Sequence, residues 1–417
     1  MKYKNRYVQL ALFVCTFFVL TSSVWASDLF VNTVQDSNSL TCSTNPNGCS
    51  LRAAILFANT NSDTDTIHLT VPGIYALNGY LGANEDYGTT GDLDIRHSVI
   101  ISNESGGVVR IDGAASDRVF DIVDEGALTK TVVAEFKGVI IQNGDADFGG
   151  GIRGTGIKLV NSTVQKNHAT VDGGGIWGQA EVVSSSIYNN KAEGNGGGFY
   201  VLDPGVPSSI ETSSILNSTI SHNMTLDGFG GGLYNGPETS VDLIQVTLNK
   251  NYSLGGASLA NDPNGGILSV SNTILSDIFD ANTLPNCFGA IHSKGYNLNS
   301  NTIDNCSFDI NKGDIIGKDP ELGPFGYNGG PTPTHLPNIT SPVIDAGMDT
   351  STAIGVDQRG IARTGLYDIG AVESISPIDI QKSSSHREAK TKGPLFDPSI
   401  WMKKIQIKKV NTLKPGH

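Results

Sequence analysis

Charged residues are scarce in this sequence of 417 residues: Asp, Glu, Lys and Arg together make up 17% of it, where about a quarter is usual. So low a share excludes a coiled coil and a basic nucleic-acid-binding protein. Glycine does not recur at every third position, which excludes collagen, and the many β-branched residues exclude a disordered chain. What remains is a folded chain that is poor in charge.

Glycine and asparagine take the place of the missing charge. The chain has 50 Gly and 34 Asn, the latter outnumbering its 28 Lys and Arg. Both residue types adopt positive φ at little cost, and they alternate here with Val, Ile, Thr and Ser. This composition indicates short strands joined by tight turns.

The N-terminus has the features of a secretory signal, 1–26. Three basic residues precede an apolar run over about 10–20, and Val24 and Ala26 supply small residues for cleavage before Ser27. The alternative is an uncleaved membrane anchor, for which the run is short. No later segment is apolar enough to cross a bilayer, so we expect no transmembrane segment after signal removal.

Four cysteines remain after the signal: Cys42, Cys49, Cys287 and Cys306. Three pairings are open, and the two local ones, Cys42–Cys49 and Cys287–Cys306, close the shortest loops. Such disulfides require an oxidising compartment. Four free thiols are the alternative. A zinc site is disfavoured, because neither a CxxC motif nor clustered His accompanies the cysteines.

The net charge of −13 is divided unevenly along the chain. The signal contributes +3 and the Ser- and Lys-rich tail 374–417 contributes +6, which leaves −22 for 27–373. An acidic body argues against nucleic acid as a partner and leaves cations, basic proteins and glycans open. The tail has little apolar periodicity and is interpreted as a flexible appendage.

An internal repeat occupies about 136–278. Glycine triplets begin at Gly149, Gly173, Gly196 and Gly230, and apolar residues follow each triplet. Two apolar columns keep register with the triplets: Leu159, Val182, Ile215, Leu243 and Val270; and Val164, Ile187, Ile220, Leu248 and Leu275. Inserts explain the longer spacings. A period of about 23–28 residues is typical of a solenoid.

The kind of solenoid follows from what each repeat contains. The density of Gly and Asn excludes helical repeats, and the L-x-x-L-x-L pattern of leucine-rich repeats is absent. Alternation at period two that changes phase within each unit fits short strands separated by corners. We therefore predict an all-β, right-handed parallel β-helix, with the glycines supplying the left-handed corner conformations.

Asparagines recur at one position of the repeat and are predicted to form a hydrogen-bonded structural ladder along a corner. They are Asn167, Asn190, Asn223 and Asn251, with Asn143 taken as the same position one repeat earlier. Glycan contact is the alternative role. Acidic residues precede several triplets and suggest calcium, but their offsets vary. We therefore favour solvated turns and predict no metal or other cofactor.

The segment 50–58 predicts a short helix capped by Ser50, which would cover the first coil. Residues 49–55 (CSLRAAI) resemble the CSLREA motif that opens a family of exported bacterial β-helix proteins, with Ala53 in place of the Glu. Residues 319–373 resemble the choice-of-anchor end domain of the same proteins, through stretches such as 328–334 (NGGPTPT) and 357–360 (DQRG). The middle repeats are similar to those of polymorphic outer-membrane proteins.

This resemblance implies export and surface display or release, with the outer membrane as one destination and the periplasm as the fallback. Together with the signal and the tail, it suggests a division into the signal (1–26), a β-helix with its N-terminal cap (27–318), an irregular C-terminal cap (319–373) and the tail (374–417). The tail contains no hydrophobic span and no LPxTG motif. Retention by an anchor is therefore not predicted.

A β-helix can carry an enzyme, so acidic and basic residues on its strands and turns are candidate catalytic groups. The candidates are Asp92, Asp94, Asp112, Asp117 and Arg118. Because Asp92 and Asp94 flank an apolar residue as in an ordinary strand, and Asp117–Arg118 suits a turn ion pair, we predict structural roles. Asp345 and 357–359 are predicted to hold the terminal cap by an Arg–carboxylate bridge.

We accordingly predict a non-catalytic, adhesin-like protein that binds a glycan or an extracellular protein, with no catalytic residues. A carbohydrate-active lyase, hydrolase or epimerase and a passive surface protein are the alternatives. Three or more carboxylates or basic groups that converge in a groove would favour the enzyme. The oligomeric state is left open.

Overall fold

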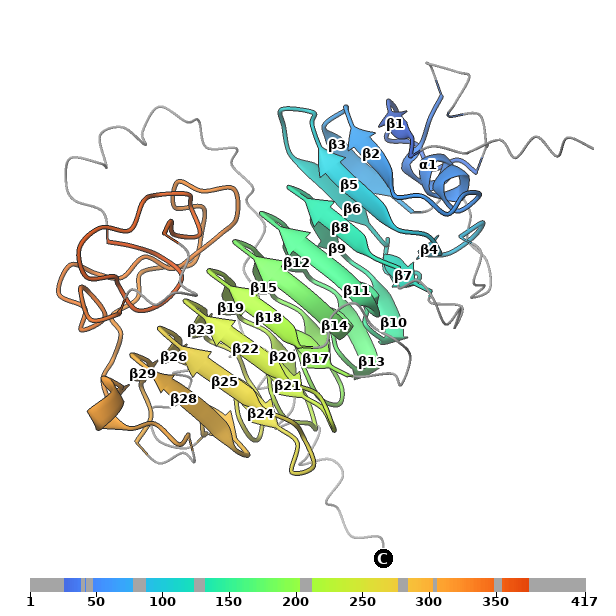
Figure 1. The fold of residues 1–417 in the computed structure, drawn as a ribbon. Coiled ribbons are helices and arrows are strands. Elements are labelled where there is room, and N and C mark those ends of the chain that lie inside the picture. The colour runs from blue at the N-terminus through green and yellow to red at the C-terminus, as the bar shows by residue number, and fades with distance from the viewer. Residues whose placement is uncertain are drawn as a thin grey trace, which may run out of the picture.

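Short strands from successive turns of the chain pair in parallel and build a single elongated stack (Figure 1). The computed structural model describes residues 26–38, 42, 48–77, 88–123, 132–202, 212–276, 284–302, 306–348 and 355–374. The predicted signal, apart from Ala26, and the tail beyond Ser374 lie outside these residues. Among the described residues, no helix is long and apolar enough to span a bilayer.

The largest sheet has 16 strands in two ladders that share β11 and β14. The first ladder is β1 (Asp28–Val31), β2 (Asp65–Leu69), β5 (Val99–Asn103), β8 (Ala134–Lys137), β11 (Ile152–Val160), β14 (Ile176–Val183), β18 (Ser213–Leu216), β22 (Val241–Ile244), β25 (Leu268–Ser271) and β28 (Ile291–Gly295). The second is β4 (Leu93–Ile95), β7 (Phe120–Ile122), β11, β14, β17 (Phe199–Val201), β21 (Leu233–Asn235), β24 (Leu259–Asn261) and β27 (Cys287–Phe288).

Two further sheets complete each coil. The ten-stranded sheet is β3 (Gly73–Ala76), β6 (Val109–Asp112), β9 (Ile140–Gln142), β12 (Thr163–Gln165), β15 (Ser186–Tyr188), β19 (Thr219–Ser221), β23 (Thr247–Asn249), β26 (Ile274–Ser276), β29 (Leu298–Asn299) and β30 (Ile315–Ile316). The four-stranded sheet is β10 (Asp145–Phe148), β13 (His168–Asp172), β16 (Lys191–Ala192) and β20 (Met224–Thr225). Since every ladder joins sequential coils in parallel, the predicted right-handed parallel β-helix is confirmed.

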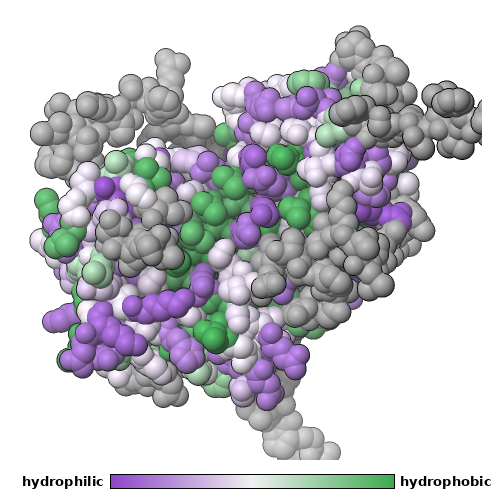
Figure 2. All heavy atoms as spheres, viewed as in Figure 1, coloured by the Kyte–Doolittle hydropathy of each residue, from purple (hydrophilic) through white to green (hydrophobic). Residues whose placement is uncertain are grey.

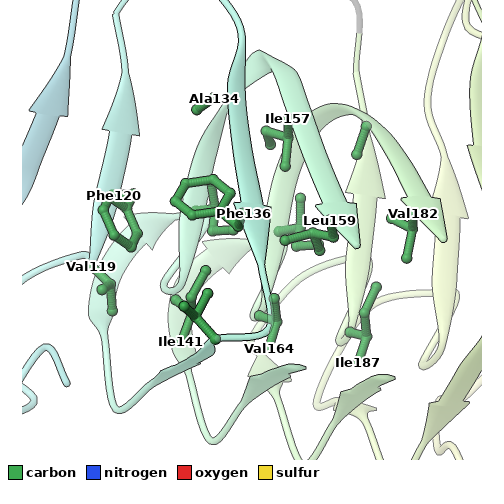
Figure 3. Close-up of a cluster of buried hydrophobic side chains, with 14 of the residues drawn as sticks. Val119, Phe120, Ala134, Phe136, Ile141, Ile157, Leu159, Val164, Val182 and Ile187 are labelled. Carbon is green, nitrogen blue, oxygen red and sulfur yellow. The ribbon is translucent and has the colours of Figure 1, made fainter. Parts of the chain in front are cut away.

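The core is the inside of the coils, where alternate side chains of each strand point inward. Figure 3 shows the two predicted apolar columns side by side, with Leu159 above Val164 and Val182 above Ile187. All four side chains are fully buried. Phe120 and Phe136 fill the wider coils before them, with ring centroids 4.7 Å apart.

The corners use positive φ, and from β11 onward glycine supplies it at only one corner of each coil; one coil earlier, Gly138 (68°) also occupies the corner that Asn161 takes in the next coil. The first glycine of each triplet has φ near 65°, as at Gly173 (69°) and Gly196 (65°). The other corners use non-glycine residues. One set is Asn161, Ser184, Asn217, Gln245 and Asn272, with φ of 47° to 56°. The prediction that glycines supply the corners is therefore corrected: Asn predominates in this set because its short polar side chain tolerates the left-handed region.

The later glycines of each triplet are needed for close approach rather than for φ. A Cβ at Gly174 would lie 2.3 Å from the carbonyl oxygen of Lys191 and 2.4 Å from that of Gly197. Adjacent coils therefore touch through their backbones at this corner.

The asparagine ladder is present with one correction. Asn167, Asn190 and Asn223 each donate from Nδ2 to Oδ1 of the next asparagine at 3.0 Å, ending at Asn251. Asn143 does not belong to it, because Gln142 pairs with Gln165, which aligns Asn143 with Lys166. Gly144 takes the ladder position instead, and its N–H donates to Asn167 Oδ1. Asn143 has φ of 56° and donates to Asp112.

Helix α1 (Leu51–Ala58) lies at the N-terminal end of the stack, as the sequence predicts (Figure 1). Ser50 caps it by accepting from the N–H of Ala53 at 3.1 Å. Leu51 and Ile55 are buried against the first coils. The disulfide Cys42–Cys49 joins the segment before the helix, and Cys287–Cys306 joins the last coils; both predicted pairings are thus present.

The irregular C-terminal segment, described at 319–348 and 355–374, runs beside the coils and contacts the ten-stranded sheet (Figure 1). The short 3-10 helix η1 (Ile310–Lys312) and β30 precede it. Gln358 donates to Ser186 and accepts from Thr219, and the N–H of Ala371 donates to Thr247. The segment therefore covers the outer face of β15, β19 and β23.

Candidate functional site

One outward-facing row of side chains crosses the second ladder of the large sheet from end to end. Strand register places these eight residues in line: Asp94, Asp121, Arg153, Trp177, Tyr200, Tyr234, Ala260 and Phe288. Their strand neighbours on either side point into the core. We call this line the outer row. It is charged at its N-terminal end and aromatic over the rest.

The charged end is a network of ion pairs. Arg118 Nη1 lies 2.8 Å from Asp92 Oδ2 and 3.2 Å from Asp121 Oδ2. Arg153 holds Asp121 from its other side, with Nε 2.9 Å from Oδ1. Asp94 accepts from the backbone N–H of Gly88. Three carboxylates and two guanidiniums thus meet on adjacent coils.

Arg52 of α1 fixes the loop that carries these acids. Its guanidinium is fully buried, pairs with Asp36 at 2.8 Å and donates to the carbonyl oxygens of Gly88, Gly91 and Asp92. An arginine has five donors in a fixed fork, so it can bind several acceptors at once. The helix thus positions Asp92 as well as covering the first coil.

Burial gives Asp92 an unusual protonation. Its side chain is 1% exposed, and desolvation raises its pKa to about 7, although Arg118 acts in the opposite direction. The negative charges of Asp117 and Asp121 raise it further. Asp92 Oδ1 is buried and has no hydrogen-bond partner. A raised carboxyl pKa is what a general acid needs at neutral pH.

Access and charge limit what this cluster can do. One oxygen from each of Asp92, Asp94 and Asp121 lies within 4.8 Å of the others, and oxygen ligands suit Ca²⁺. However, Arg118 and Arg153 already offset two of the three negative charges. The side chains of Asp92, Asp121 and Arg118 are at most 3% exposed. A polymer therefore cannot reach the carboxylates in this conformation.

The aromatic part of the outer row is partly accessible at its two ends, whereas Tyr200, Tyr234 and Ala260 between them are buried. Trp177 is partly buried and packs against Phe148, with ring centroids 5.4 Å apart. Tyr200 and Tyr234 stack at 5.1 Å and are 9% and 7% exposed. Phe288, at the other end, is partly buried against these residues. The row is thus an aromatic floor whose two ends project furthest.

A second aromatic pair extends the far end. Phe229 stacks on Phe288 at 4.5 Å and is itself 37% exposed. At a coil spacing of about 4.8 Å, the four steps from β14 to β27 span about 19 Å. The platform is therefore long enough for several units of a polymer.

Two carboxylates lie beside the middle of the floor. Asp262 accepts from the hydroxyl of Tyr234 at 2.6 Å. Asp172 directly precedes Gly173, where an added Cβ would lie 2.8 Å from Trp177 Cβ. Burial, followed by the charges of Asp172 and Asp262, raises the pKa of Tyr200 to about 12. Asp172 accepts from the N–H of Asn195 at 2.6 Å.

The predicted candidates divide into two groups. Asp92, Asp94 and Arg118 come together, whereas Asp112 lies on the ten-stranded sheet, where Gln142 and Asn143 donate to it. The predicted Asp117–Arg118 ion pair is wrong, because the guanidinium turns to Asp92. Asp117 Oδ1 accepts the backbone N–H of Arg118 instead.

Sequence reasoning missed Arg52, Asp121, Arg153 and the outer row. Of these residues, only Arg52 belongs to a motif that the sequence analysis described, the CSLRAAI stretch. Asp121 and Arg153 belong to no motif.

The acids and arginine of the C-terminal segment hold its loops. Arg359 Nη2 lies 2.6 Å from Asp357 Oδ2, and both side chains are fully buried. Arg359 also donates to the carbonyl oxygen of Glu373. The N–H of Asp345 donates to Asp368. These contacts are those of a locked loop.

Comparison with known proteins adds one structural likeness. No family model matches the chain, and no curated protein matches it. Among solved structures it is similar to a crystal structure of pectate lyase Pel9A, with 15% sequence identity and a TM-score of 0.40, over 84% of this chain and 96% of that one. The fold assignment rests on the strand topology given above.

Proposed function

We propose that this protein binds an extended carbohydrate chain outside the cytoplasm, along the aromatic part of the outer row, and does not cleave it. The observation that carries the proposal is the in-register line of Trp177, Tyr200 and Tyr234, which Phe288 continues beyond Ala260. Sugar rings present apolar C–H faces that pack on aromatic rings, and a repeating surface suits a repeating ligand.

The flanking polar groups suit the same ligand. The carboxylates of Asp172 and Asp262 lie beside the floor and accept hydrogen bonds, which sugar hydroxyls donate. Ligand sites typically combine an apolar surface with a few placed polar groups. The two disulfides agree with an oxidising, extracytoplasmic location. The resemblance to exported β-helix proteins supports secretion or surface display.

The test is a glycan array and affinity electrophoresis on the purified full chain, with Trp177→Ala as the variant. Losing one stacking ring is expected to weaken glycan binding about tenfold. Tyr327→Ala is the matched control, since Tyr327 is 51% exposed on the C-terminal segment, away from the row. Equal binding by both variants, or no glycan bound by the wild type, contradicts the proposal.

The carboxylate cluster favours a second candidate, cleavage of a polysaccharide. Asp92, with its raised pKa, would be the acid, and Asp94 or Asp121 the second carboxylate. Because these carboxylates are buried, we do not favour cleavage and expect no product from neutral or acidic polysaccharides. Unsaturated or reducing-end product from the wild type that Asp121→Asn abolishes would replace binding by catalysis.

A further inference from the structure

We infer that the outer row selects a glycan bearing amino groups, which are protonated and therefore cationic, over an acidic glycan. This inference rests on the proposed glycan binding and adds the charge of the ligand. It follows from which charged side chains surround the aromatic floor and from whether each one is paired with a side chain of opposite charge.

The first step is the pair of carboxylates at the middle of the floor. Asp172 directly precedes Gly173, the corner glycine that packs against Trp177, and Asp262 accepts from the hydroxyl of Tyr234. Within the described part of the chain, neither forms an ion pair with Lys, Arg or His. Their partners are neutral: the backbone N–H and side-chain amide of Asn195 for Asp172, and the hydroxyl of Tyr234 and the backbone N–H of Asn264 for Asp262. Two negative charges beside the floor are thus left without a cation.

The second step is the surface next to the floor. The four-stranded sheet leads through the glycine triplets into the second ladder, so its outer residues flank the row. Asp147, Glu193 and Asp227 are exposed there. Lys191 is the cation among them, and it pairs with Glu193 at 3.3 Å. This flank therefore adds negative charge.

The third step is the cation at the other end. Arg153, the only basic member of the outer row, is bound to Asp121 on the neighbouring strand. Arg118 is buried between Asp92 and Asp121. The arginines that an acidic sugar would require are thus already held by carboxylates. Polyanion binding would have to break these pairs.

An ammonium group fits this arrangement on physical grounds. Half-buried carboxylates beside apolar rings act in a reduced dielectric, which strengthens their attraction for a cation. Ammonium groups are also attracted to the faces and edges of electron-rich aromatic sites. The net charge of −22 for residues 27–373 adds a long-range field of the same sign. The same charges repel uronate chains.

The experiment compares ligands that differ in charge on one backbone. Oligomers of glucosamine and of N-acetylglucosamine are titrated against the full chain at mildly acidic pH and low salt, beside a neutral β-glucan and polygalacturonate, with and without a chelator. We expect the glucosamine oligomer to bind about tenfold more tightly than its acetylated counterpart, and the preference to shrink as salt rises.

Variants assign the preference to the row. Asp172→Asn with Asp262→Asn is expected to abolish the preference, so that the glucosamine and N-acetylglucosamine oligomers bind this variant equally. Asp242→Asn is the matched control, because Asp242 lies on the first ladder and pairs with Lys294 at 2.7 Å. It should leave the preference unchanged.

The outcomes separate the two proposals. Equal binding of both oligomers, or tighter binding of polygalacturonate, overturns the inference and leaves glycan binding intact. A preference that the control variant also loses overturns it as well. Binding of a lysine oligomer without any glycan, or of no ligand at all, overturns both proposals.

Discussion

Acidification is expected to loosen the C-terminal segment before it unfolds the coils. His335 of this segment is 1% exposed against β19 and β23. Its Nδ1 donates to the carbonyl oxygen of Gly323 at 2.9 Å, and Nε2 accepts from the Asn249 amide at 3.2 Å. His222 lies parallel to it at 6.0 Å, and its Nδ1 is 2.7 Å from Ser221 Oγ. Both rings are therefore built in as neutral imidazoles.

The magnitude follows from the pKa values. Burial, with the neighbouring Lys250, lowers the pKa of His335 to about 4, although its bond to Gly323 opposes the shift. Burial, with His335 and Lys250, lowers that of His222 to about 3. In the unfolded chain both titrate near 6.5. Between pH 6.5 and 4 the unfolded state therefore binds more protons, and stability falls as pH falls. At 1.36 kcal/mol per unit, each histidine costs up to about 3 kcal/mol by pH 4.

A global assay would blur this loss, because Asp92 acts with the opposite sign at the other end of the molecule. Its pKa of about 7 lies above that of the unfolded carboxyl. The folded state therefore binds more protons between about pH 4 and 7, and acid stabilises the N-terminal coils by a few kcal/mol. Hydrogen exchange resolved by segment removes the contribution of Asp92. Within the C-terminal segment, burial also raises the pKa of Asp368 and of Glu373, which offsets part of the histidine effect, so the histidine variants measure that effect directly.

The assay follows backbone exchange of 319–348 and of 152–160 from pH 7 to 4, after correction for intrinsic exchange. Protection of 319–348 is expected to fall by at least tenfold, and that of 152–160 to hold. His335→Gln with His222→Gln, which keeps hydrogen-bonding groups without a titration, should flatten the dependence. Loss of protection in both segments together, or an unchanged slope in the double variant, would refute the reasoning.

Three further predictions concern the coils. Gly174→Ala is expected to lower the free energy of unfolding by about 3 kcal/mol or more, because the new Cβ would meet two carbonyl oxygens. Gly326→Ala is the control: it has open space around it and should change the melting temperature little. Asn223→Ala removes two hydrogen bonds of the buried ladder and should lower the free energy of unfolding, measured in urea, by about 2–4 kcal/mol. A small decrease would contradict a stabilising role of the ladder. Reduction of the disulfide between Cys287 and Cys306, which are 19 residues apart, should lower the free energy of unfolding by about 3 kcal/mol according to the loop-entropy model. The measurement compares the unfolding midpoint with and without reductant.

Features repeated along the chain could be predicted from the sequence. The inward columns recur because every coil must fill the same interior, so Leu159 and Val164 have counterparts one period later. The disulfide pairs followed from loop length. Ser50 and its helix followed from local capping chemistry. Each of these features depends on residues close in sequence or on a periodic constraint.

The prediction for Asn143 was wrong because the alignment of its repeat was shifted by one residue. Asn143 lies one residue before the ladder position, because Ile141 is the inward residue that pairs with Val164 and the ladder position follows three residues later, at Gly144. A strand exchanges its faces with every single step, so a shift by one residue changes the role of a side chain completely. Only the register of β9 against β12 decides that alignment.

The candidate site lay beyond the sequence for a different reason. Outward positions are free of the packing constraint that makes the core periodic, so the outer row changes from Asp to Arg to Trp to Tyr without a recurring signal. Tyr200 and Tyr234 are neighbours across an insert that lengthens the repeat between them. Asp121 pairs with Arg153 from the next coil. The sequence by itself determined a β-helix, its interior and its cross-links, because these obey local and periodic rules. Only the tertiary structure decided which outward side chains meet, because stacking of the coils sets their distances.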